Sequence, residues 1–311
     1  MQTIFGLWDI QVGSKLSMLI SPGNFQESKT MLKDKNVADY LFRTSDQIHG
    51  HVKHEDYIKC PGTAFLNFCI DAKNTIEYCK NNFPKQSSTL NENGLSLDSN
   101  IKIQHITNSS LALLMGHFET YEKYLFAGIF ERTIYLQQFN SSKFFQELDS
   151  RWKQEIVQIN QNHFLGYRGE NLSVGLLIAD SLNGWHEPKK VNEYIQSFGF
   201  KINFFSNEDL EDLSCLWQLR HSIVHTAATI TKPDAQKIAQ LVQHSGRNIV
   251  FTNKFIFELV KGFHIILQES HERLQEKFIE EINNNNTDKY EDIKNFLKVV
   301  SKEPRLFDKN V

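Results

Sequence analysis

Apolar residues recur at helical spacing along much of the chain and predict a mainly α-helical protein. The clearest pattern covers residues 109–138, where steps of three and four residues place apolar side chains on one face. These side chains are Leu111, Leu114, Phe118, Tyr121, Leu125 and Ile129. Asn108 or Ser109 can cap the start of this helix. We therefore expect one long helix with a single buried face.

Further helices are expected on both sides of this segment. The predicted ranges are 64–79, 141–160, 171–182, 188–198, 233–243, 252–280 and 288–301. The helix at 188–198 opens with Pro188, which suits the first helical position, and ends near Gly199. A break is expected at Ser245-Gly246, followed by a short extended piece.

Two polar stretches divide the chain. Residues 84–100 have loop composition and are the preferred domain boundary, and Asn283 to Asn286 form an asparagine linker. We therefore expect an N-terminal region of unknown role at 1–105, either mixed or helical. A helical domain should follow at 106–280, and a linker with a last helix at 281–311.

Residues 207–225 form the helix with the most chemistry. Ser206 to Asp209 is a capping box at its start. With a turn of about 100° per residue, an apolar stripe runs along this helix through Leu213, Leu216, Trp217, Ile223 and Val224. Arg220 falls in the middle of the stripe. A buried lone charge is costly, so this guanidinium must meet a carboxylate, a subunit interface or a water-filled cleft.

His221 and His225 lie one helical turn apart beside the same stripe. Histidine titrates near neutral pH and can act as a general base or acid. Arginine stays charged, and its fork matches phosphate oxygens. Together these groups suit the cleavage of RNA by the 2′-hydroxyl group of the RNA strand itself, a reaction that requires no metal.

Structural roles explain the same residues. Arginine and histidine are favoured near a helix C-terminus by the helix dipole. Arg220 could also form a structural ion pair with Glu119, Glu122 or Glu211. The Arg-x4-His spacing alone is therefore weak evidence for catalysis.

Composition narrows the class of protein. The 311 residues carry a net charge of −3. This charge argues against a protein that binds nucleic-acid duplexes with high affinity, but it allows a local cleft that binds a short stretch of single-stranded RNA. The four cysteines, at 60, 69, 79 and 215, form no Cys-x-x-Cys pair, so neither a metal site nor any cofactor is expected.

The small number of cysteines in a chain of this length favours a reducing compartment. The N-terminus has no signal-peptide pattern. The most apolar window, residues 255–267, is interrupted by Glu258 and Lys261 and is too short for a bilayer. We expect a cytoplasmic protein with no membrane contact.

The segment from Leu213 to Thr226, LSCLWQLRHSIVHT, resembles the signature of the HEPN superfamily. That motif is an arginine, a polar residue, three variable residues and a histidine at the end of a core helix. Here these positions are Arg220, His221 and His225. The resemblance covers about residues 106–280 and does not reach residues 1–105.

The resemblance implies an HEPN-like helical bundle that dimerises with its motif helices facing each other. The active site would then be composite, with Arg220, His221 and His225 as catalytic residues. The long predicted helix resembles the first core helix of the family, and Glu119 and Glu122 on it are the expected structural partners of the motif.

Family members are metal-independent endoribonucleases, often toxins or anti-phage effectors that act on tRNA or mRNA. Lys189, Lys190 and Arg247 are candidate phosphate contacts on the substrate. A cognate inhibitor or sensor protein is a further expected partner. The tyrosine that follows the motif histidine in some members is absent, because Thr226 and Ala227 stand there. The rival reading is a non-catalytic helical sensor or scaffold in the same kind of system.

Overall fold

The computed structural model describes residues 52–85, 95–152, 173–282 and 289–307. All of them lie in one compact unit that comprises residues 51–311. Most of the N-terminal region, the asparagine linker and the end of the helix expected at 141–160 lie outside the described residues.

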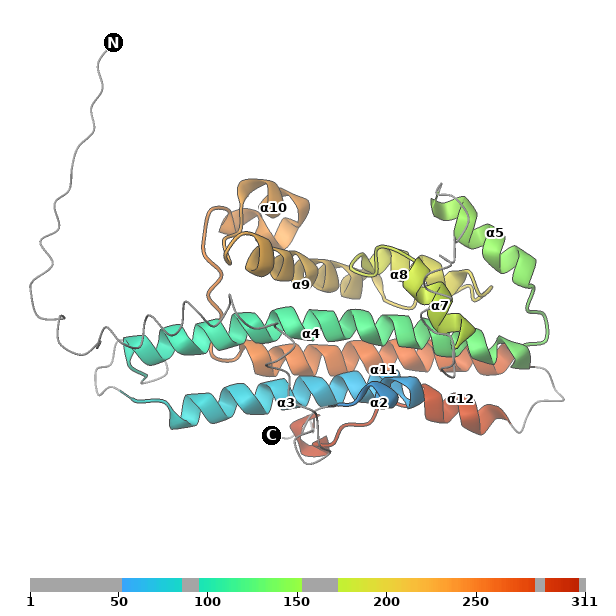
Figure 1. Cartoon of the computed structure of the whole chain (residues 1–311), viewed down its shortest axis with the longest axis horizontal. Coiled ribbons are helices and arrows are strands. Elements are labelled where there is room, and N and C mark those ends of the chain that lie inside the picture. Colours follow the sequence, from blue (N-terminus) through green and yellow to red (C-terminus); the bar gives the residue numbers. More distant parts are fainter. Residues whose placement is uncertain (1–51, 86–94, 153–172, 283–288, 308–311) are drawn as a thin grey trace, which may run out of the picture. The chain divides into compact units, whose positions relative to one another are not determined.

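Three long helices form the body of this unit and lie side by side in Figure 1. They are α3 (Pro61–Asn82), α4 (Leu97–Arg132) and α11 (Phe255–Glu281). Phe65, Phe118 and Phe263 contribute one ring from each helix, and their centroids lie 5.0 to 5.3 Å apart. These rings are fully enclosed, so the centre of the core is an aromatic contact among all three helices.

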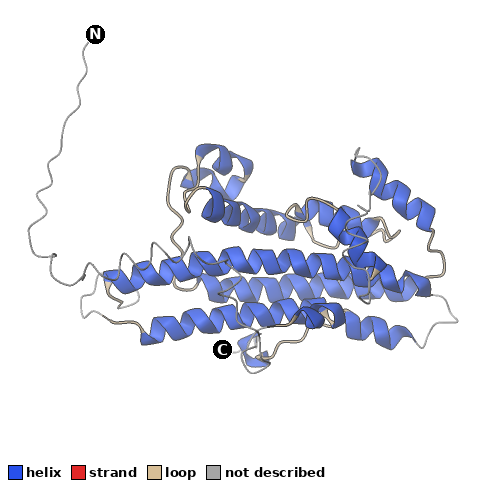
Figure 2. Ribbon diagram, in the orientation of Figure 1, coloured by secondary structure: helices blue, strands red, loops and turns tan. Residues whose placement is uncertain are grey.

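Shorter helices cover this body. They are α2 (His54–Lys59), α5 (Ser141–Trp152), α7 (Val174–Ser181), α8 (Pro188–Gln196), α9 (Asn207–His225), α10 (Lys232–Lys237) and α12 (Tyr290–Phe296). Short 3₁₀ turns lie at Thr133–Tyr135, Ala239–His244 and Pro304–Phe307. Figure 2 shows helices joined by loops, and the described residues contain isolated bridges but no strand. The chain is therefore a mainly α-helical bundle, as predicted.

Contact between α7 and α4 requires a glycine. A Cβ atom at Gly175 would lie 2.4 Å from the carbonyl oxygen of Ala127. The backbone amide of Gly175 also donates a 2.8 Å hydrogen bond to Glu131. The missing side chain thus lets two helix backbones approach closely.

The structure differs from the sequence-based expectation at the start of α4. This helix begins at Leu97, inside the polar stretch 84–100, and the Ser96 hydroxyl caps it through the Ser99 amide at 3.2 Å. Because α3 packs against both α4 and α11, residues 61–82 share the core of the domain that we expected at 106–280. The polar stretch is a connection between two packed helices.

The C-terminal residues also belong to the bundle. Arg132 of α4 forms a salt bridge of 2.9 Å with Asp292 of α12. The carbonyl oxygen of Lys298 accepts a hydrogen bond of 2.9 Å from Thr63 at the start of α3. The expected last helix is shorter than predicted, since α12 ends at Phe296.

Apolar side chains form two clusters. The larger one fills the bundle. The smaller one contains Ile230, Ala235, Leu241 and Ile249 from the segment that follows α9. Leu219 and Ile223 of α9 are partly buried and pack against both clusters, so α9 lies between them.

Candidate functional site

Local interactions fix both ends of α9. The Ser206 hydroxyl accepts from the Asp209 amide at 3.1 Å, and the Asp209 carboxylate accepts from the Ser206 amide at 2.8 Å. The helix ends at His225, and the Thr226 hydroxyl donates to the Ser222 carbonyl at 2.9 Å. The predicted capping box and the predicted helix bounds are confirmed.

The buried face of α9 rotates along its length, which the predicted stripe did not anticipate. Leu213 and Trp217 in its first part are buried as expected. Further along, Ser222 is completely buried, while the side chain of Val224 is 49% exposed. The cause is the segment after α9, which packs its small cluster against Leu219, on another side of the helix. Arg220 therefore lies at the edge of the buried face.

Arg220 is half-buried. Its Nε atom is buried and has no hydrogen-bond partner among the described residues. The ion pair that we considered with Glu119, Glu122 or Glu211 is not formed in the described part of the chain. Its positive charge thus has no neighbouring carboxylate within salt-bridge distance there.

Glu119 and Glu122, the expected partners of the motif, have other surroundings. Glu119 forms a salt bridge of 2.9 Å with Lys123 on the same helix. Glu122 is enclosed by the bundle, and neither of its carboxyl oxygens has a partner among the described residues. Burial, assisted by the charge of Glu119, holds the pKa of Glu122 well above its ordinary value. Neither glutamate forms an ion pair with Arg220 in the described part of the chain, which corrects the expected pairing with the motif.

His221 and His225 are both exposed, and their rings lie side by side. The ring centroids are 4.7 Å apart, with an angle of 44° between the planes. The two imidazoles thus come together at the C-terminal end of α9, as the helical spacing predicted. Arg220 lies next to His221 in sequence and one turn from Val224 on the same side of the helix.

A pocket of about 520 Å³ opens beside His221. We call it the α8–α9 pocket. It is lined by His186, Glu187, Pro188, Lys189, Ser214, Trp217, Gln218, His221, Lys237 and Ile238. Arg220 and His225 are not among the lining residues, so the pocket is an extension of the motif on the His221 side.

The three candidate phosphate contacts differ in their placement. Lys189 is exposed and lines the α8–α9 pocket with His221. Lys190 lies within 2.6 Å of the Glu187 carboxylate. Arg247 is exposed and follows Gly246 outside this pocket. The structure brings only Lys189 together with a motif residue.

The sequence-based search missed Asp234, a buried carboxylate near the motif. It accepts hydrogen bonds from Thr231 at 2.7 Å and from Lys237 at 2.9 Å. These bonds, and in smaller part the charge of His221, keep the pKa of Asp234 below its ordinary value. The spacing of Thr231 and Asp234 around Pro233 is a helix-start pattern that could have indicated it.

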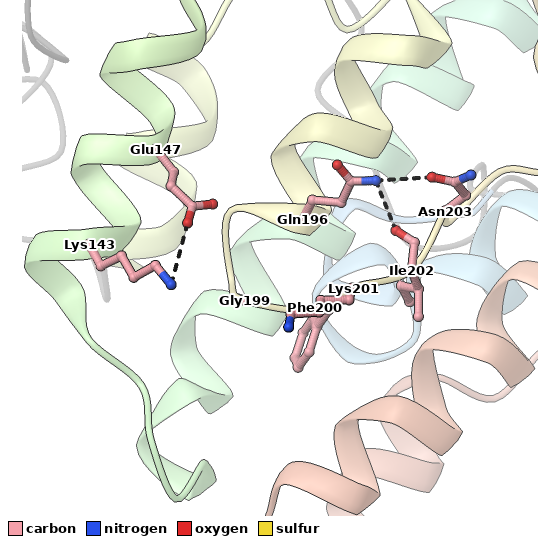
Figure 3. A pocket seen from close by; sticks show the side chains of 8 residues that line it. All are labelled: Lys143, Glu147, Gln196, Gly199, Phe200, Lys201, Ile202 and Asn203. Atoms are coloured by element: carbon pink, nitrogen blue, oxygen red, sulfur yellow. Dashed lines mark hydrogen bonds and ion pairs between the residues drawn. The ribbon is translucent and has the colours of Figure 1, made fainter.

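A second pocket, of about 470 Å³, lies between α5 and the end of α8 (Figure 3). The Gln196 amide donates to the Ile202 carbonyl at 3.1 Å and to Asn203 at 3.0 Å. Lys143 lies 3.8 Å from Glu147. The lining of this second pocket contains no histidine. The motif at the end of α9 therefore remains the candidate site.

Metal binding and membrane insertion find no support in the described residues. No group of three or more histidine, cysteine or acidic side chains there is arranged to hold a metal ion. No helix there combines the length and apolar character that crossing a bilayer requires.

Comparison with known proteins identifies the family. The RiboL-PSP-HEPN family model matches residues 67–250, a span that starts within α3 and includes α9 with the complete motif. No curated protein and no solved structure matches significantly. HEPN domains bind RNA and often dimerise, and membership suggests a nuclease or RNA-binding function. Since the match covers more than half of the 311 residues, the chain belongs to the RiboL-PSP-HEPN family.

Proposed function

We propose that the protein is a metal-independent endoribonuclease that cleaves RNA through the 2′-hydroxyl group. One observation carries the proposal. Arg220 has no carboxylate partner among the described residues, and the same helix end carries two exposed imidazole rings whose centroids are 4.7 Å apart. The three groups share one helix end, and the family context suggests nuclease or RNA-binding function.

The reaction assigns a task to each group. One histidine removes the proton of the 2′-hydroxyl, whose oxygen attacks the adjacent phosphorus. A second histidine protonates the 5′-oxygen as its bond to phosphorus breaks. The guanidinium of Arg220 binds the equatorial oxygens while negative charge accumulates on them. The products are a 2′,3′-cyclic phosphate end and a 5′-hydroxyl end.

This chemistry favours a site built from two copies of the chain. The attacking and leaving oxygens lie on opposite sides of the phosphorus, so base and acid must reach it from two directions. The rings of His221 and His225 in one copy lie side by side on one helix face. A second motif helix opposite the first would supply the other direction, and we propose such a homodimer.

The biological setting follows from the same proposal. We infer a toxin or an anti-phage defence effector that acts on tRNA or mRNA in the cytoplasm. A cognate inhibitor or a sensor protein would keep such an enzyme in check.

An RNA cleavage assay in EDTA tests the activity. The wild type should convert total tRNA or mRNA to fragments with cyclic phosphate ends. Arg220→Ala and His225→Ala should each lower the rate about 100-fold or more. Loss of a general acid or base costs about 10² to 10⁴, and loss of a donor to the transition-state oxygens costs about 10² to 10³. His105→Ala is the matched control, because His105 is an exposed histidine on α4, and it should cleave like the wild type.

Two outcomes contradict the enzyme. Cleavage that survives both motif substitutions would show that another site or a contaminant is responsible. An inert wild type, tested with varied activation conditions, would instead favour the rival function of a non-catalytic sensor or scaffold.

A further inference from the structure

The α8–α9 pocket has a positive lining drawn from three elements. Lys189 comes from the start of α8, His221 from α9 and Lys237 from the end of α10. The acidic residue in the lining is Glu187, and its carboxylate lies 2.6 Å from Lys190 and 3.9 Å from His186. Lys237 forms a salt bridge of 2.9 Å with the buried carboxylate of Asp234, and its side chain is still largely exposed. The lining therefore favours an anion.

Two buried donors in the lining lack acceptors. The indole Nε1 of Trp217 and the amide Nε2 of Gln218 are buried without a hydrogen-bond partner among the described residues. Trp217 is 7% exposed and Gln218 is 8% exposed. A buried donor without an acceptor is unfavourable. Both nitrogen atoms are buried, so a ligand that offers oxygen acceptors at this wall would satisfy them once the two side chains move to expose them.

The direction of α8 adds to the positive potential. This nine-residue helix begins at Pro188, which lines the pocket. The dipole of α8 favours an anion at this terminus, whereas its amides offer little, because Pro188 has no N–H. The Lys190 and Val191 amides already donate to the Glu187 carbonyl at 2.8 and 3.3 Å. The terminus, the two lysines and the two donors all point to one ligand chemistry.

The pocket in Figure 3 provides a contrast within the same chain. Lys143 and the Gln196 amide there have partners inside the pocket, namely Glu147 and the Ile202 carbonyl. The α8–α9 pocket differs because the buried donors of Trp217 and Gln218 have no such partners among the described residues.

We propose that the α8–α9 pocket binds a phosphate-bearing ligand, namely the nucleotide of the RNA strand next to the one that is cleaved. His221 belongs to the motif and also lines the pocket, so an RNA strand could continue from the motif into the pocket. This inference rests on the proposed function in taking RNA as the ligand. A free nucleotide offers the same phosphate chemistry and is distinguished by the test.

A binding measurement separates this proposal from catalysis. In the full-length His225→Ala protein, which should not cleave, the affinity for a fluorescent single-stranded RNA is measured by anisotropy, and AMP binding is measured by calorimetry. Lys189→Ala and Lys237→Ala are then combined in this background. Lys201→Ala, an exposed lysine in the other pocket, is the matched control, and thermal melting confirms that each variant is folded.

We expect the two pocket substitutions to weaken RNA binding at least tenfold and to reduce the salt dependence by about two phosphate contacts. The Lys201 variant should stay within twofold. Weakened AMP binding with unchanged RNA binding would identify a free nucleotide as the ligand and would also support a phosphate site. Unchanged binding of both ligands would overturn the inference. The cleavage assay of the wild type does not enter this comparison, so a failure of the nuclease proposal would be seen separately.

Discussion

Glu122 shows how a single enclosed carboxyl group couples stability to pH. Its pKa is raised above the ordinary value of 4.5, first by burial and then by Glu119. The neutral form fits the fold, so its contribution to stability is complete below about pH 4.5. That contribution is lost as the pH rises toward the pKa of the folded state.

Glu122→Gln should therefore remove this part of the pH dependence. The glutamine cannot ionise, so the stability of the variant relative to the wild type should increase between pH 5 and pH 8. Urea denaturation at several pH values measures the difference. Glu276→Gln, at an exposed position on α11, is the control and should follow the wild type. Parallel pH profiles for the Glu122 variant and the wild type would refute the assignment.

For single residues, the sequence predicted the placement of the two motif histidines but not the surroundings of Arg220. Helical spacing alone brings the rings of His221 and His225 together. Among the described residues Arg220 has no carboxylate partner, and Ser222 is buried where the Ala228 amide of the following turn donates to its carbonyl at 3.0 Å. Such contacts come from tertiary packing, which local periodicity does not contain.

Among the elements, the turn after α9 has an unusual backbone conformation. Ala227 and Ala228 adopt positive φ angles of 52° and 59°, a left-handed conformation that disfavours residues with a Cβ. This turn redirects the chain directly after His225. Ala227 is exposed, so substitutions there report mainly on the backbone conformation.

Ala227→Val should lower the free energy of unfolding by about 1–2 kcal/mol, because a branched side chain is strained at positive φ. Ala227→Gly should cause no such loss, since glycine adopts this conformation readily. Chemical denaturation of both variants gives the comparison. Equal stability of the valine variant and the wild type would mean that the left-handed turn is not formed in solution.

Element boundaries were predictable where local signals exist. The capping box at Ser206 fixed α9, and Pro188 fixed α8. The first turns of α4 were missed because residues 97–108 are mostly polar, and few of them, such as Ile103, are buried. That part of α4 is stabilised by its cap and by the Gln104 side chain, which donates to the Phe251 carbonyl and accepts from the Phe251 amide.

For the whole molecule, the helical class and the family were predictable from the motif and the periodicity. The extent of the bundle was not. Phe65 of α3 meets Phe118 and Phe263, which are far away in sequence, and no local pattern states that these helices pack together.

The proposed homodimer makes a prediction at this scale. Val224 is an exposed apolar residue between the two motif histidines. Val224→Glu should place like charges opposite each other across the two-fold axis, convert the dimer to monomers and abolish cleavage. Light scattering after size-exclusion chromatography measures the mass. Ile134→Glu, at another exposed apolar position, should remain dimeric. A monomeric wild type, or a dimeric Val224 variant, would contradict the arrangement.

The position of α9 between two apolar clusters has a consequence for how this family can diversify. Leu219 and Ile223 must satisfy the bundle and the small cluster at the same time. A mutation that reshapes the buried cluster of Ile230, Ala235, Leu241 and Ile249 would be transmitted to α9 through these two side chains. Evolution could therefore tune the proposed site from buried positions outside it, with the requirement of paired changes on both sides of one helix.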